Sequence, residues 1–115
     1  MGTVNQMIGT SPARRMIGPM SRSMVERKLV EVSEQLQQLR AELGVTDEQF
    51  LQFAETADDA RLRALVSETP LADREHHDAQ RHVDAMGRHR ADVQSKIDRL
   101  ERRQDELLDQ LMAEH

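Results

Sequence analysis

Residues 67–71 read Ser67-Glu68-Thr69-Pro70-Leu71, and they separate two long stretches in which apolar residues recur at alternating steps of four and three. Alternating steps of this size are the period of a coiled coil. Thr69 is suited to cap a following helix, and Pro70 suits its first position, where the missing N–H costs nothing. The sequence therefore predicts an all-α fold, an antiparallel coiled-coil helical hairpin with arms at about 23–66 and 70–114.

Two matching series of inward positions define the predicted contact between the arms, which we call the seam. In the first arm the seam positions are Val25, Leu29, Val32, Leu36, Leu39, Leu43, Thr46, Phe50, Phe53, Ala57, Ala60 and Ala64. In the second arm they are Ala72, His76, Ala79, Val83, Met86, Arg90, Val93, Ile97, Leu100, Gln104, Leu107 and Leu111. Folding the chain near Pro70 sets Ala64 opposite Ala72, and each later pair of opposing residues, or layer, again has numbers that add to 136. Leu36 is therefore expected opposite Leu100.

Charged residues beside the seam agree with this register. Opposite charges are expected to meet in three pairs, Arg63 with Glu75, Arg61 with Asp73, and Glu42 with Lys96. Each exposed pair contributes at most about a few tenths of a kcal/mol, so the pairs select the register more than they stabilise the fold.

The seam is uneven along its length. The layers next to the turn combine Ala64 with Ala72 and Ala57 with Ala79, whereas the opposite end, which we call the open end, is rich in leucine and valine. Burial of apolar area contributes about 25 cal/mol per Å², so small alanine layers add little stability. We therefore expect the turn end of the hairpin, the tip, to be weakly held.

One local signal competes with an unbroken first arm. The segment Leu43-Gly44-Val45-Thr46-Asp47-Glu48-Gln49 is typical of a glycine helix end followed by a capping box. A true turn at Gly44 would give a three-helix bundle instead of a hairpin. Because the seam keeps its phase across this glycine, a hairpin with a break at Gly44 is favoured over the bundle.

Composition restricts the class of protein. Residues 1–22 hold three of the five glycines, two of the three prolines and no acidic residue, which predicts a disordered basic tail before a helical hairpin domain at 23–115. No apolar run approaches the ~20 residues of a membrane span, and there is no cysteine for a disulfide or a thiolate metal site. We expect a soluble, cytoplasmic protein that does not bind a membrane.

The residues that could carry chemistry do not converge. Four histidines fall in the first half of the second arm, at His76, His77, His82 and His89. Their helical phases place them on different faces, so we expect no metal ion and no cofactor. No turn or strand organises a nucleophile, and a two-helix rod has no enclosed site, so we predict no catalytic residue. The negative body and its two aromatic residues disfavour direct nucleic-acid binding.

The tip carries the strongest candidate for a binding surface, because acidic residues cluster there around exposed apolar ones. We name as the tip surface Asp58, Asp59, Leu62, Leu65, Val66, Glu68 and Leu71. The predicted ion pairs leave Asp58, Asp59 and Glu68 as its free acids. A charged end on a long rod is suited to enter a larger partner. We therefore predict a non-enzymatic protein–protein interaction module, an adaptor or regulator that presents its tip or an arm.

The segment Pro70-Leu71-Ala72-Asp73-Arg74-Glu75, together with the rod over residues 25–111, resembles the coiled-coil arms of Gre-type transcript cleavage factors and DksA-like factors. The resemblance lies in architecture and tip charge, and it implies a transcription regulator that reaches into the secondary channel of RNA polymerase. The globular or zinc-bearing domain that those families use for docking is missing from this sequence. The chain also looks like small uncharacterised helical-hairpin proteins of actinobacteria, a likeness that implies no function.

A third hypothesis is a self-assembling structural coiled coil. A thin two-stranded rod is only marginally stable on its own. Met24, Leu108 and Met112 lie off the seam near the open end, where a second copy could cover them. This hypothesis predicts a homodimer.

Overall fold

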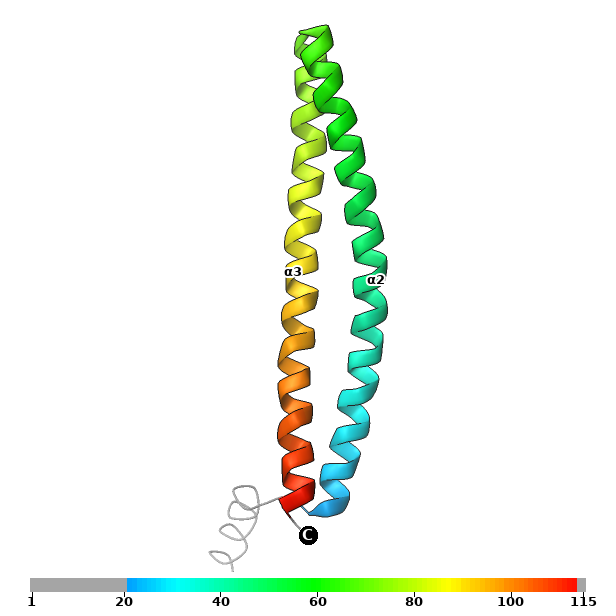
Figure 1. The fold of residues 1–115 in the computed structure, drawn as a ribbon, viewed down its shortest axis with the longest axis vertical. Helices are drawn as coiled ribbons and strands as arrows, with labels where there is room; N and C mark the ends of the chain where they lie inside the picture. The colour runs from blue at the N-terminus through cyan, green and yellow to red at the C-terminus, as the bar shows by residue number, and fades with distance from the viewer. Residues whose placement is uncertain (1–20, 114–115) are drawn as a thin grey trace, which may run out of the picture.

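The computed structural model describes residues 21–113, which form two long helices lying side by side in opposite directions (Figure 1). Helix α2 spans Arg22–Ser67 and helix α3 spans Pro70–Ala113. At ~1.5 Å per residue each helix is roughly 65–70 Å long. The all-α hairpin predicted from the sequence is confirmed, with both arm boundaries within one residue of the expected ones. Neither of these helices is long and apolar enough to cross a membrane.

Side chains cap the start of each helix. Ser21 Oγ accepts a hydrogen bond from the Met24 N–H at 3.3 Å, and Thr69 Oγ1 accepts one from the Ala72 N–H at 3.2 Å. The second bond confirms the predicted cap at Thr69. Ser21 and Arg22, both within the predicted disordered tail, are instead the cap and the first residue of α2. The rest of that predicted tail, residues 1–20, lies outside the described residues.

The core is a single line of side chains between the helices, and it coincides with the predicted seam. Its buried apolar residues are Val25, Val32, Leu36, Ala57, Ala60, Ala72, Val93, Ile97 and Leu107. All of them are seam positions. Thr46 is buried with 2% of its surface exposed, whereas Arg90 is the one seam residue that is mainly exposed. So thin a core buries few side chains for a chain of this length.

Contacts between the arms confirm the predicted register. Gln104 donates a hydrogen bond to Ser33 Oγ at 3.3 Å, and the numbers of these two residues add to within one of 136. The rings of Phe53 and His82 also face each other across the seam, with centroids 5.6 Å apart, and their residue numbers again add to within one of 136. Leu36 and Leu100 belong to one hydrophobic cluster, as their expected pairing requires.

The break predicted at Gly44 does not occur. Helix α2 continues through this residue, and no glycine in residues 21–113 has a positive φ angle. The three-helix alternative is therefore wrong as well. Thr46, proposed as a helix cap, is instead a buried seam residue, so the continuous apolar seam outweighs the local glycine signal.

The three flanking ion pairs predicted across the seam are not those that form within the described residues. Arg61 lies 3.9 Å from Asp58 in its own helix, Lys96 lies 3.2 Å from Asp92, and Glu42 lies 3.6 Å from His89. Arg63 and Glu75 line the same hollow without an ion pair between them. Arg61 and Lys96 pair one turn apart, which needs no alignment of two helices, whereas Glu42 keeps a cross-arm contact but with a different partner.

Candidate interaction surface at the hairpin tip

The tip surface is assembled mainly by the last turns of α2. Its five residues in this helix are Asp58, Asp59, Leu62, Leu65 and Val66. They form two rows, Asp58-Leu62-Leu65 and Asp59-Leu62-Val66, with steps of three or four residues, so they share one broad face of the helix. The buried Ala57 and Ala60 occupy the opposite face, against α3. The same periodicity that builds the seam therefore turns the tip surface outward.

Four large apolar side chains of the tip surface are open to solvent. Their exposed fractions are 52% for Leu62, 64% for Leu65, 85% for Val66 and 62% for Leu71. Leu71 comes from the first turn of α3, so both helices contribute. Single exposed leucines are common on protein surfaces, so it is the placement of these four near one end of the rod that makes them a candidate interaction surface.

The turn itself places Glu68 in an unfavourable backbone conformation. Glu68 ends α2 with φ 53° and ψ 35°, in the left-handed region, and its N–H donates to the Ala64 carbonyl at 3.1 Å. Glycine is the usual residue at such a helix end, because a side chain costs about 1–2 kcal/mol there. An acidic residue is thus held at the very end of the rod at a local cost in stability.

The acids of the tip surface are not equivalent. Asp58 lies 3.9 Å from the Arg61 guanidinium, so the expectation that it is a free acid is wrong. Asp59 and Glu68 are exposed and form no ion pair within residues 21–113. Asp58 and Arg61 are one turn apart on α2, a local pairing that cross-arm reasoning overlooked. Two carboxylates of the tip surface are therefore unneutralised, and the nearby Asp73 and Glu75, which lack their predicted cross-arm partners, also form no ion pair within the described residues.

Packing beneath the tip leaves a hollow between the arms. The hollow has a volume of about 330 Å³, and Ala60, Ala79, Phe53 and His82 are among the residues that line it. The Nδ1 atom of His76 is buried without a hydrogen-bond partner. An unpaired buried polar atom costs about 1–3 kcal/mol, so this end of the seam contributes little to stability.

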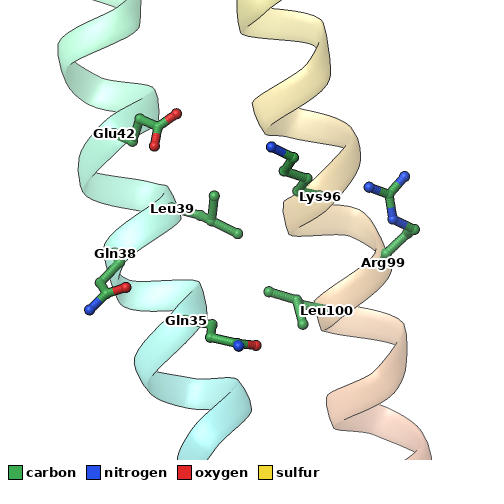
Figure 2. Close-up of a pocket in the computed structure, with 7 residues that line it drawn as sticks. All are labelled: Gln35, Gln38, Leu39, Glu42, Lys96, Arg99 and Leu100. Carbon is green, nitrogen blue, oxygen red and sulfur yellow. The ribbon is translucent and has the colours of Figure 1, made fainter.

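A second surface feature, not predicted from the sequence, is an open groove between the arms near the middle of the rod (Figure 2). It encloses about 470 Å³ and has Leu39 and Leu100 at its floor. Its rims are formed by Gln35, Gln38 and Glu42 on α2 and by Lys96 and Arg99 on α3. The groove exists because the arms lie far enough apart at this point. That separation depends on the packing of many layers together, so no single residue in the sequence predicts it.

The histidines of α3 do not gather into a metal site. His89 lies near Glu42, and His76 stacks with His77 at a centroid distance of 5.8 Å. No cluster of three or more His, Asp or Glu side chains within residues 21–113 has the geometry to hold a metal ion.

Comparison with known proteins identifies no relative of this chain. No protein-family model, no curated protein and no solved structure matches it.

Proposed function

We propose that this chain is a non-enzymatic protein–protein interaction module that presents the tip surface to a larger protein. The observation that carries the proposal is the group of exposed apolar side chains, Leu62, Leu65, Val66 and Leu71, at the end of a long rod. Burying such a group against a partner removes apolar area from water at about 25 cal/mol per Å². Its place at the end of the rod lets it enter a recess while the arms stay outside.

The backbone at Glu68 gives independent support. A glycine there would be more stable, because the left-handed conformation is costly for any other residue. Local rules of stability are most often broken at functional sites. Retaining a carboxylate at this point is consistent with a partner surface that carries positive charge next to an apolar recess.

Affinity purification with matched variants tests the proposal. Leu65→Ser removes an apolar side chain from the tip surface, and Leu51→Ser removes one of nearly equal exposure, 62% against 64%, from the middle of the same helix. The two positions are fourteen residues apart and so lie on the same flank of α2. Proteins captured by the tagged wild type should be lost with Leu65→Ser and kept with Leu51→Ser.

Two outcomes contradict the proposal. Equal loss of capture by both variants would point to the arm as the binding element, and unchanged capture by Leu65→Ser would remove the role of the tip. Circular dichroism should show both variants as helical as the wild type, because neither position contributes to the buried seam.

A regulator of the secondary-channel type is a second candidate, favoured by the free carboxylates of Asp59 and Glu68 at the tip of a two-helix rod. Bacterial RNA polymerase should then retain the tagged chain, and the neutral variant Asp59→Asn with Glu68→Gln should weaken retention. The matched control neutralises Glu34 and Glu48, which are exposed acids far from the tip. Retention that ignores the tip charges, or no retention at all, rejects this candidate.

A further inference from the structure

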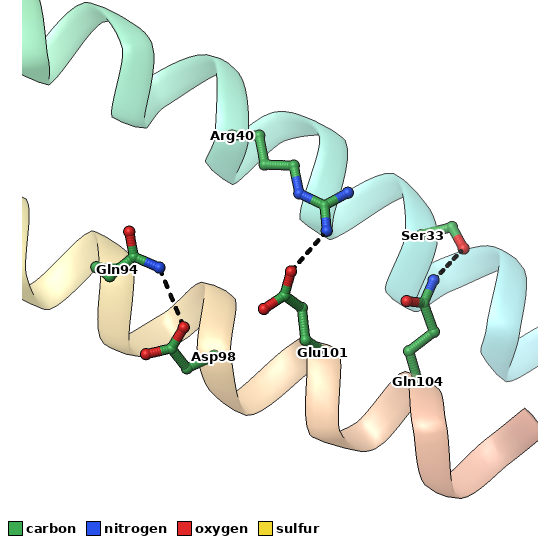
Figure 3. Close-up of polar contacts among 6 residues, drawn as sticks. All are labelled: Ser33, Arg40, Gln94, Asp98, Glu101 and Gln104. Atoms are coloured by element: carbon green, nitrogen blue, oxygen red, sulfur yellow. Dashed lines mark hydrogen bonds and ion pairs between the residues drawn. The ribbon is translucent and has the colours of Figure 1, made fainter.

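The two flanks of the seam differ in the middle of the rod. On one flank polar contacts join the arms: Ser33 with Gln104 at 3.3 Å, Arg40 with Glu101 at 2.9 Å, and Asp47 with Arg90. Figure 3 shows the first two of these contacts. Ser33, Arg40 and Asp47 are seven residues apart, so they lie on the same side of α2. We call this side the bridged flank.

The opposite side, which we call the open flank, carries the groove over Leu39 and Leu100 (Figure 2). Both leucines point into the space between the arms, and both are only partly buried. The one cross-arm ion pair here is the 3.6 Å contact between His89 and Glu42, which exists only when His89 is protonated. Core leucines are therefore covered on the bridged flank and uncovered on the open flank.

The two rims of the groove carry complementary chemistry. The α2 rim offers Glu42 with Gln35 and Gln38, and the α3 rim offers Lys96 and Arg99. Lys96 lies 3.2 Å from Asp92 in its own helix, whereas Arg99 donates a hydrogen bond to Ser95 Oγ at 3.0 Å and meets no carboxylate within residues 21–113. A negative rim and a positive rim on one surface make that surface complementary to itself.

We propose that a second copy of this chain covers the open flank, with a two-fold axis parallel to the rods. This axis sets α2 of each copy against α3 of the other, and it brings the Glu42 rim of one copy beside Lys96 and Arg99 of the second copy. A two-fold axis across the rods would instead set like rims together, α3 against α3. The charges therefore select the arrangement in which both tips lie at the same end.

The area available suits a specific dimer. Two helices side by side are about 20 Å wide, and half of the rod is about 35 Å long, so each copy can bury roughly 700 Å². Standard interfaces bury about 800 Å² per partner. Four helices around Leu39 and Leu100 would also complete a core that two helices leave thin. The dimer presents two tip surfaces together, which raises avidity for a repeated or symmetric partner.

Sedimentation equilibrium on the full chain tests the association. The wild type should be dimeric at about 100 µM, and Glu42→Lys should raise the dissociation constant at least about tenfold, because symmetry introduces the repulsion twice. Adding Lys96→Glu to this variant should restore the dimer. Glu101→Lys is the matched control, since it makes the same charge change on the bridged flank and should leave association unchanged.

A monomeric wild type at this concentration overturns the proposal and leaves the groove to solvent or to a different protein. Equal weakening by Glu42→Lys and Glu101→Lys overturns the assignment to the open flank. Circular dichroism on each variant separates lost association from lost folding. Both charge changes lie on exposed side chains, so the helical signal should not change.

A spin label tests the orientation. The chain has no cysteine, so Ser67→Cys gives a single labelling site at the end of α2. Parallel hairpins should give a label separation of about 20–30 Å, the width of two or three helices. Hairpins paired with opposite orientation about the groove would separate the labels by roughly 80 Å, and that result would overturn the proposed axis.

Discussion

Substituting Gly44 by alanine should stabilise the hairpin, and the sign of the effect distinguishes a continuous α2 from a turn at this residue. Gly44 lies inside α2 without a positive φ angle, and a Cβ atom added there would meet nothing within 4 Å. The gain is therefore the intrinsic helix preference of alanine over glycine, about 0.5–1 kcal/mol. If Gly44 ended a helix in the left-handed conformation, the same substitution would cost about 1–2 kcal/mol.

Urea unfolding followed by circular dichroism at a fixed protein concentration measures the difference. A gain of this size should also raise the melting temperature by roughly 2–8 °C for a domain of this length. Gly87→Ala calibrates the effect, because Gly87 lies inside α3 and its added Cβ would rest 3.5 Å from Phe50 Cε1, an ordinary contact. Stabilisation by Gly87→Ala together with destabilisation by Gly44→Ala would refute the continuous helix.

Three further substitutions test the packing by the same unfolding measurement. Leu107→Ala should lose about 2–5 kcal/mol, because Leu107 is fully buried and its removal leaves a cavity; a loss below about 1 kcal/mol would contradict the buried seam. Thr69→Ala should lose about 0.5–2 kcal/mol with the helix cap, whereas Thr56→Ala, which removes only a bond to the Gln52 carbonyl, should be nearly neutral; equal effects would deny the cap. His76→Leu should gain about 1 kcal/mol by removing the unpaired Nδ1, and a loss would mean that this nitrogen has a partner.

The seam could be predicted from the sequence because burial leaves a periodic trace in it. Residues such as Val25, Leu36 and Leu107 are fully buried at the positions that steps of four and three assign to them. One register satisfies all layers at once, and a shift would expose the apolar side chains. The register, in which opposing residues have numbers that add to 136, therefore follows from the periodicity and the position of the turn alone.

The surface could be predicted only in part. Exposure of Leu65 and Val66 follows from their place outside the seam, but the partner of each charged side chain does not. Arg61 pairs with Asp58 in its own helix and not with Asp73 across the seam. The free energies of two such exposed ion pairs differ by less than about 1 kcal/mol. The groove at Leu39 depends on how far the arms diverge, which is a property of the whole rod.

The unequal distribution of leucine and alanine along the seam has a consequence for how the hairpin folds. The leucine layers, such as Leu36 with Leu100, join residues that are far apart in the chain, whereas the alanine layers join residues close to the turn. Contacts of long sequence separation slow folding, because the entropy of ordering the intervening chain is lost before they form. We expect the barrier to be crossed only when leucine layers meet, so substitutions in them should slow folding while tip substitutions mainly speed unfolding.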